Sequence, residues 1–480
     1  MKHIKISLIL ALFLLSACVQ NDINNGNPEQ SSETKNEHTT EASINNSESN
    51  LGISNNDKPR KDNQPIEIEY LTFQDKRLEN KIINYLKENK IINNDTRKIK
   101  KESLSKIKKL DLKTCGLINL DDLSQFQYLE YIDLSNYEFM EEMGFFDDFD
   151  SNKINDLTPL RNLNNINHLD LSNLNKNNQK NLAESKNIAI ISKLTKLEYL
   201  DISNTGIQDI SFLKNNPNLK VLKVNGNDIE DFSVLEQLKN LEIIEMKHNN
   251  IKSVDIITKL EHLKEIKILG NNAIKDYELL NNISDKVNVD VKYDFIADNT
   301  VVDINNEEAK EFIKKEADIN GDDIKKSDLA SITSLYLPSC QIQDISWIKH
   351  FVNLVEFRLG DQSISDISSF ENLNKLKFLD ISYNDIQDIN CVRNMENLTE
   401  LIAYDNLIED IRPIIENDKI KECDITKNRI QAIDCLRDRK APLRLDVRQN
   451  PLEKNDEIFD NLREIRDGLN EEVYIELDIP

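Results

Sequence analysis

Glycine and proline are scarce in this sequence, with 10 of each among 480 residues. Enzymes that cradle phosphate groups use glycine-rich loops, and the sequence has no GxGxxG, GxSxG or P-loop pattern. Its six histidines form no cluster or HExxH helix, and its six cysteines have no zinc-ligand spacing. We therefore expect a protein that is not an enzyme, with no cofactor and no metal site.

Basic residues are also in deficit, because 61 Lys and Arg stand against 86 Asp and Glu, which leaves a net charge of −25. Such a charge repels the phosphate backbone, so nucleic acid is excluded as a partner. The chain length also exceeds what one hydrophobic core usually serves. Either several globular domains or one elongated repeat array is expected.

The first 18 residues contain an apolar run that is too short to span a bilayer. Residues 1–5 are MKHIK, residues 6–15 are apolar apart from Ser7, and the sequence LSAC ends at Cys18. This segment resembles a bacterial lipoprotein signal, which is cleaved before the cysteine whose thiol then receives a diacylglycerol. The resemblance implies a signal peptide at 1–17 and a lipid anchor on Cys18, which places the protein at the cell surface on the extracytoplasmic face of the membrane. An uncleaved or ordinary secretory signal is the alternative.

Residues 18–65 follow with no aromatic residue and few aliphatic ones. Such a segment cannot bury enough apolar surface to fold, so it is predicted to be a disordered tether. As a coil it would hold the folded part of the chain away from the membrane.

The rest of the sequence repeats with a period of 22 residues. Leu-x-Leu pairs alternate with period two, which predicts short strands whose leucines point into the core. The repeated positions are Leu200, Leu222, Ile244 and Ile266, and then Leu335, Phe357, Leu379, Leu401, Cys423 and Leu445. An asparagine follows most of these strands, and its amide can satisfy backbone groups where the chain turns. A repeat array is therefore expected, in which each coil packs only on its neighbours.

The segments LDISNTGIQDISFL at 200–213 and LDISYNDIQDI at 379–389 resemble the 22-residue leucine-rich repeats of the bacterial internalin-like family. The resemblance implies an α/β fold: a right-handed, curved solenoid with a parallel sheet on its concave face and short helical or extended segments outside. Known members bind other proteins on the concave sheet. The resemblance therefore implies a protein partner, of the host or of the bacterial surface.

Two stretches have the helical spacing of a cap that covers the open end of a solenoid. The stripes are Leu78, Ile82 and Leu86 in the first stretch and Ala309, Ile313 and Ala317 in the second. A second cap in the middle of the chain indicates that the first array has ended. We expect one array with its cap over 66–300, and a second array with a helical cap and a C-terminal cap over 301–480. One continuous arc is the alternative.

Insertions interrupt the first array, where two repeat spacings between residues 132 and 200 are 37 and 31 residues. The first insertion lies within the acidic segment 140–156. Asp148, Asp150 and Asn152 in it have the alternating spacing of calcium ligands, but no glycine bend or closing glutamate follows. A solvated acidic loop is expected, and calcium binding stays the alternative.

Residues on either side of the inward leucines point out of the concave sheet. Aromatic residues and an arginine recur at or just beyond these positions, and we predict that they bind the partner. They are Tyr131, His168, Tyr199, Tyr336, Arg358, Phe378, Tyr383 and Tyr404. The alternative is that these rings only cover one another. The expected function is a surface-exposed adhesion or recognition scaffold, and the alternative is a structural envelope component or glycan-binding spacer.

Overall fold

Short parallel strands recur along the chain in a computed structural model that describes residues 69–137, 151–174, 182–294, 296–439, 441–452 and 473–476. They form two sheets in chain order, one of eight strands and one of seven. The first sheet consists of β1 (Lys109–Asp111), β2 (Tyr131–Asp133), β3 (His168–Asp170), β4 (Tyr199–Asp201), β5 (Val221–Lys223), β6 (Ile243–Glu245), β7 (Glu265–Lys267) and β8 (Asn288–Val289). The second consists of β9 (Ser334–Tyr336), β10 (Glu356–Arg358), β11 (Phe378–Asp380), β12 (Glu400–Ile402), β13 (Glu422–Asp424), β14 (Leu443–Asp446) and β15 (Val473–Glu476).

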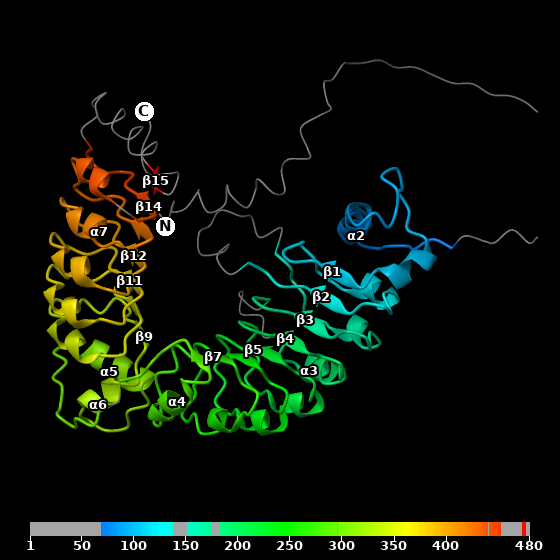
Figure 1. The fold of residues 1–480 in the computed structure, drawn as a ribbon, viewed down its shortest axis with the longest axis horizontal. Helices are drawn as coiled ribbons and strands as arrows, with labels where there is room; N and C mark the ends of the chain where they lie inside the picture. Colours follow the sequence, from blue (N-terminus) through cyan, green and yellow to red (C-terminus); the bar gives the residue numbers. More distant parts are fainter. Residues whose placement is uncertain are drawn as a thin grey trace, which may run out of the picture.

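The predicted inward positions lie at the centres of these strands. Leu200 pairs with Leu222, and Phe357 pairs with Leu379, so that the residues in register stack from coil to coil. All four side chains are completely buried. The chain is therefore a leucine-rich-repeat solenoid, with its strands lining the inner, concave side of the curve (Figure 1).

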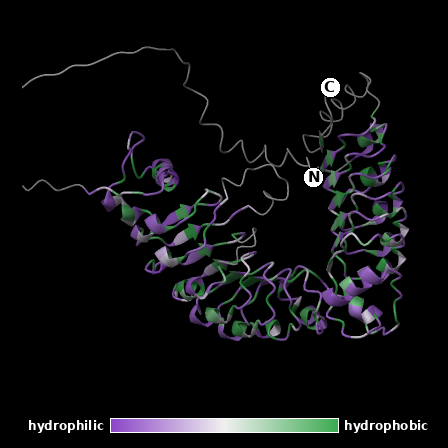
Figure 2. Ribbon diagram, turned by 180° about the vertical axis from the view of Figure 1, so that it is seen from behind, coloured by the Kyte–Doolittle hydropathy of each residue, from purple (hydrophilic) through white to green (hydrophobic). Residues whose placement is uncertain are grey.

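Short helices lie on the outer side of the coils, because the 22-residue repeat leaves only a few residues to return to the next strand. The 3-10 helices are η1 (Lys101–Lys106), η2 (Asp121–Gln125), η3 (Thr158–Leu160), η4 (Ser211–Asn215), η5 (Ser233–Gln237), η6 (Ile257–Lys259), η7 (Ser346–His350), η8 (Ser368–Asn372), η9 (Asn390–Asn394) and η10 (Asp434–Asp438). The outer α-helices are α3 (Ser185–Ile191), α4 (Glu278–Ile283) and α7 (Arg412–Glu416). Hydrophobic and hydrophilic residues alternate along the coils (Figure 2). Among the described residues, no helix is both long and apolar enough to cross a membrane.

Both predicted helical caps are present. Helix α2 (Lys76–Glu88) begins at Asp75, whose carboxylate accepts hydrogen bonds from two backbone amides of the first turn, and it buries Leu78, Ile82 and Leu86. Helix α5 (Glu307–Glu316) begins at Asn306, and the short α6 (Lys326–Leu329) follows it before β9. Ala309, Ile313 and Ala317 are completely buried. Each sheet therefore begins behind an amphipathic helix.

Amide side chains form a ladder through the interior at the turn after each strand. Asn227 is typical: its Oδ1 accepts from the amide of Thr205 at 2.9 Å, and its Nδ2 donates to the carbonyl of Ile202 at 2.7 Å. Each rung thus joins two neighbouring coils by satisfying buried backbone groups. The same role falls to Asn152, Asn249, Asn271, Gln362, Asn384, Asn406, Asn428 and Asn450.

The position of Asn152 corrects one interpretation of the sequence. Its Oδ1 accepts from the amides of Cys115 and Leu117, its Nδ2 donates to the carbonyls of Leu112 and Leu134, and the residue is 2% exposed. Its candidacy as a calcium ligand is therefore wrong, because the insertion precedes the ladder position and displaces it along the sequence. Asp148 and Asp150 lie outside the described residues.

The two sheets meet at a bend, and both face the space inside it (Figure 1). Buried asparagines bridge the junction. Asn272 of the first array accepts from the amide of Thr333 at 3.1 Å and donates to the carbonyl of Ser334 at 2.8 Å. Asn353 of the second array accepts from the amide of Asp294 at 2.7 Å. The arrays are thus joined by direct contacts, while the proposed boundary between residues 300 and 301 stays a prediction.

Candidate binding surface

The predicted binding residues fall into two groups on the inner face of the bend. Tyr131, His168 and Tyr199 lie on neighbouring strands of the first sheet. The other five belong to the second array: Tyr336, Arg358 and Phe378 lie on strands β9 to β11, whereas Tyr383 and Tyr404 lie just beyond β11 and β12. The inner face therefore carries one group of rings on each sheet.

Tyr131, His168 and Tyr199 form a continuous stack, which we call the aromatic ladder. The ring centroids of Tyr131 and His168 are 4.1 Å apart with an interplanar angle of 19°. Those of His168 and Tyr199 are 3.9 Å apart with an angle of 8°. All three side chains are half-buried. The rings both cover one another and remain partly open to solvent, because parallel pairing puts identical positions side by side at the strand spacing of about 4.8 Å.

Aspartates occupy the next outward column, one on each of the first four strands, and we call them the carboxylate row. They are Asp111, Asp133, Asp170 and Asp201, and their backbones pair in register. This row was not predicted from the sequence, although the repeated Leu-Asp-x-Ser pattern was a signal for it. Each ladder ring and the aspartate two residues later lie on the same face of one strand.

A local turn fixes three of these carboxylates. Oδ1 of Asp133, of Asp170 and of Asp201 accepts a hydrogen bond of 2.9 Å from the backbone amide of the serine two residues later. Within the described part of the chain, Oδ2 of these three residues accepts no hydrogen bond, and none of them belongs to an ion pair. Asp133 is 8% exposed and Asp201 is 7% exposed. These two carboxylates are therefore largely desolvated, whereas Asp170 is half-buried and Asp111 is exposed.

Burial changes the protonation of both columns. It raises the pKa of Asp201 to about 6, with the Asp170 carboxylate adding to the effect, and it raises the pKa of Asp170 as well. Burial lowers the pKa of His168 to about 4 and raises the pKa of Tyr131 to about 12. At neutral pH Tyr131 and His168 are therefore uncharged, while Asp201 is mostly ionised.

Two lysines of the chain itself lie against the ends of the ladder. The Lys109 ammonium is 4.1 Å from the centroid of Tyr131, and the Lys223 ammonium is 5.8 Å from the centroid of Tyr199. These are cation–π distances. Lys223 also pairs with Glu245 at 3.2 Å. The inner face of the first array thus already accommodates ammonium groups beside its rings.

The second array carries smaller aromatic contacts. The Arg358 guanidinium lies 4.6 Å from the ring centroid of Phe378, and the rings of Tyr383 and Tyr404 meet edge to face at 4.5 Å. Tyr336 is 62% exposed, without a ring contact among the described residues. Tyr383 has a φ of 55°, in the left-handed region that bulky residues rarely adopt. It therefore belongs to the turn that follows β11.

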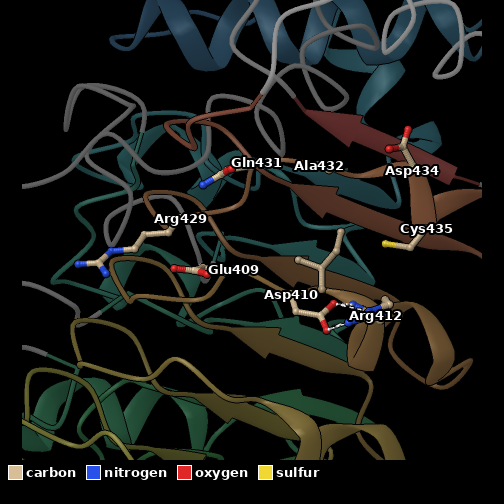
Figure 3. A pocket seen from close by; sticks show the side chains of 9 residues that line it. Glu409, Asp410, Arg412, Arg429, Gln431, Ala432, Asp434 and Cys435 are labelled. Atoms are coloured by element: carbon tan, nitrogen blue, oxygen red, sulfur yellow. Dashed lines mark hydrogen bonds and ion pairs between the residues drawn. The ribbon is translucent and has the colours of Figure 1, made fainter.

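A hollow of about 370 Å³ opens beside Arg412 and Cys435 in the second array (Figure 3). Arg412 donates from Nε and Nη2 to both carboxylate oxygens of Asp410, so this charge pair is already satisfied. Burial raises the pKa of the Cys435 thiol to about 11, which keeps it protonated and a weak nucleophile at neutral pH. Among the described residues, no group of three or more His, Cys, Asp and Glu could hold a metal ion. We therefore place the candidate site on the inner face of the sheets.

Comparison with known families identifies part of the repeat array. Residues 195–237 match the family model described as Leucine Rich repeats (2 copies). This segment holds β4, η4, β5 and η5, so these two coils of the first array match leucine-rich repeats. No curated protein matches the chain.

Two of the solved structures that resemble the chain come from Listeria monocytogenes and Leptospira interrogans. An internalin from Listeria monocytogenes is 21% identical with a TM-score of 0.36, and the match covers 76% of this chain and 92% of the internalin. A leucine-rich-repeat protein of Leptospira interrogans is 17% identical with a TM-score of 0.31, and the match covers 79% of this chain and 97% of that protein. TM-scores this low do not establish the fold by themselves. The fold is shown by the pairing of the parallel strands.

Proposed function

We propose that this protein is a non-enzymatic scaffold that binds a partner protein on its concave face and is held at the cell surface by a lipid on Cys18. The observation that carries the proposal is the aromatic ladder: three stacked, half-buried rings on the inner face of the first sheet. Aromatic side chains supply much of the binding energy at protein interfaces. Cys18 and residues 18–65 lie outside the described residues, so the anchor and the tether are supported by sequence alone.

The rigidity of the surface supports the same proposal. Each strand is fixed by its neighbours and by the amide ladder, so the inner face loses little conformational freedom when a partner binds. A solenoid also offers an extended surface that a passive spacer would not need. Stacked rings that remain partly exposed favour recognition over spacing.

Two double variants of the full chain test the proposal: Tyr131→Ala with Tyr199→Ala, and Phe378→Ala with Tyr404→Ala. Binding of each to candidate cell-surface and envelope proteins would be measured by pull-down followed by titration. Truncation of central aromatic anchors at an interface weakens binding by about thirtyfold. We expect this loss for at least one double variant.

The matched control is Tyr128→Ala with Tyr70→Ala, since these tyrosines are 52% and 43% exposed and lie outside the two sheets. The control variant should bind as the unchanged protein does. Melting curves of all variants show whether each remains folded at the assay temperature. Unchanged binding by both concave-face variants would favour the structural or glycan-binding spacer instead.

A further inference from the structure

We propose that the concave face of the first array binds an extended, lysine- and arginine-rich segment of its partner, with the cationic groups on the carboxylate row and their aliphatic stems along the aromatic ladder. This inference rests on the proposed function and specifies the chemistry of the partner.

The carboxylate row has the geometry to accept several cations in a line. Asp133, Asp170 and Asp201 follow one another on neighbouring strands, so their carboxylates recur at about 4.8 Å. In the described part of the chain, each Oδ2 accepts no hydrogen bond. A guanidinium or ammonium carries several donors that suit such open oxygens.

The ladder beside the row suits the stems of the same side chains. Lysine and arginine lay their methylene stems along apolar surface while their charged ends reach polar groups. Two lysines of the chain lie at the ends of the ladder, with the Lys109 ammonium 4.1 Å from the ring centroid of Tyr131 and the Lys223 ammonium 5.8 Å from that of Tyr199. The middle strand has only His168 and Asp170 on its outer face, and burial keeps His168 uncharged at neutral pH. The middle strand therefore supplies no cation of its own, and Lys113 is the nearby lysine that acts electrostatically on Asp170. In the proposed complex a cation of the partner lies over this strand.

Because the pKa of Asp201 is close to 6, we expect binding of a cationic partner to change the protonation of this carboxylate. Asp170 on β3 raises the pKa of Asp201, and Lys223 on β5 lowers it, while burial has the largest effect and brings it to about 6. Tyr199 on the same strand and Glu245 on β6 also lie in this cluster, and Glu245 is paired with Lys223. A cation from the partner would favour the ionised carboxylate. Binding near pH 6 should therefore release protons, and it should weaken as the pH falls further.

The test uses the full chain and a fluorescent decapeptide of alternating lysine and serine, with alternating glutamate and serine as its counterpart. The row variant carries Asp133→Asn, Asp170→Asn and Asp201→Asn. The control variant carries Glu230→Gln, Glu236→Gln and Glu261→Gln, which removes the same charge from exposed positions outside the strands. Fluorescence anisotropy is measured at about 0.15 M salt, where charges more than about 8 Å apart are largely screened.

We expect the lysine peptide to bind and the glutamate peptide not to bind. The row variant should lose about tenfold or more in affinity, because its charges contact the bound peptide in the proposed complex. The control variant should change by less than about twofold, because its three charges lie outside the strands. Calorimetry at pH 6 in two buffers of different ionisation enthalpy should detect proton release with the unchanged and control proteins, but not with the row variant. Equal losses in both variants, or no loss in either, would overturn the inference.

Competition separates this inference from the proposed function. If the lysine peptide binds at the row and displaces a partner captured by the ladder, both stand. A second outcome is that the ladder variants lose the partner, while the lysine peptide neither binds at the row nor displaces the partner. The proposed function then stands, and the inference that the partner segment is cationic is wrong. If the peptide binds at the row while both concave-face double variants still capture the partner, the concave-face function is wrong.

Discussion

Asp201 is a carboxylate that the fold would be more stable without. It is 7% exposed, and burial raises its pKa to about 6, so at neutral pH it is ionised in a poorly solvated place. A raised pKa in the folded state means that the protonated form favours folding. Its contribution to stability is therefore fully present below the unfolded pKa of about 3.9 and is lost as the pH rises through about 6.

Replacement of Asp201 by asparagine should stabilise the protein at neutral pH. The asparagine Oδ1 can keep the hydrogen bond from the Ser203 amide, and the neutral amide resembles the protonated acid. At pH 7.5 we expect a gain of roughly 1–3 kcal/mol in the free energy of unfolding, which shrinks as the pH falls from about 6 to 4. Urea unfolding at pH 7.5, 6 and 4 measures this gain.

Asp231→Asn is the matched control because the pKa of Asp231 is shifted in the opposite direction from that of Asp201. The backbone amide of Ser233 lowers the pKa of Asp231, so the ionised form of this exposed carboxylate favours folding. Its replacement should not stabilise the protein at pH 7.5. A gain for Asp231→Asn similar to that for Asp201→Asn would show that general charge relief, and not burial at the row, explains the effect.

Single residues on the inner face could be predicted only in part. Period-two alternation places Tyr131, His168 and Tyr199 on one face, and their shared position in the repeat puts them side by side. Their stacking and partial burial follow from the distance between strands in the folded sheet, which the sequence does not state. Tyr383 follows β11, and its φ of 55° places its backbone in the turn after that strand. Whether the eight residues bind a partner stays a prediction.

At the scale of a single coil, the amide ladder supplies hydrogen bonds to buried backbone groups that would otherwise have no partner at the turn. Asn249 is 5% exposed, accepts from the amide of Ile229 at 2.9 Å, and donates to the carbonyls of Val224 and Met246. Removal of such a side chain leaves several buried backbone groups unpaired. The rung therefore matters more for stability than its size suggests.

Asn249→Ala should destabilise the protein by about 2–4 kcal/mol, since more than one buried backbone group loses its partner. Asn250→Ala is the control, because Asn250 is exposed and adjacent. Its free energy of unfolding should change by less than about 0.5 kcal/mol. Chemical denaturation compares the two variants, and equal stabilities would show that the rung contributes little.

The 22-residue period predicted most of the strands, because each coil buries the same positions of the repeat against its neighbours. The inward positions from Leu200 to Leu445 lie at strand centres, and the helical stripes of α2 and α5 are buried as expected. The coil with the first insertion broke the period, and Asn152 was therefore given the wrong role. Gln362 was overlooked because a longer amide fills the same place in the ladder.

At the scale of the whole molecule, the bend depends on residues that no repeat pattern marks. Asn353 is completely buried and holds the backbone of Asp294 through hydrogen bonds of 2.7 and 2.9 Å, and it also donates to the carbonyl of Ala330. These contacts join the end of the first array to the second. They could not be predicted from the sequence, because they occur once and have no spacing.

Asn353→Ala should loosen this junction. The loss of several buried hydrogen bonds should cost about 2–4 kcal/mol. We expect faster hydrogen–deuterium exchange around residues 292–294 and 330–333, while the amides of β4 and β11 keep their protection. The exposed Asn372→Ala is the control. Unchanged exchange at the junction would contradict the role given to Asn353.

The anchor is tested on the full-length precursor. Diacylglycerol attachment requires a thiol, so Cys18→Ser should leave the precursor unprocessed or release the protein from the membrane fraction. Detergent phase partitioning of the unchanged and variant proteins measures this. A Cys18→Ser protein that still enters the detergent phase would show that the lipoprotein interpretation is wrong.

The central claim is that a partner protein contacts the concave face. A photo-crosslinking aromatic amino acid at Tyr199, Tyr336 or Tyr128 of the full chain tests it most directly. Tyr336 on β9 and Tyr128 outside the sheets are similarly exposed, at 62% and 52%, so they differ mainly in location. After irradiation with the captured partner, we predict adducts from Tyr199 or Tyr336 and none from Tyr128. Adducts from Tyr128 alone would contradict the account.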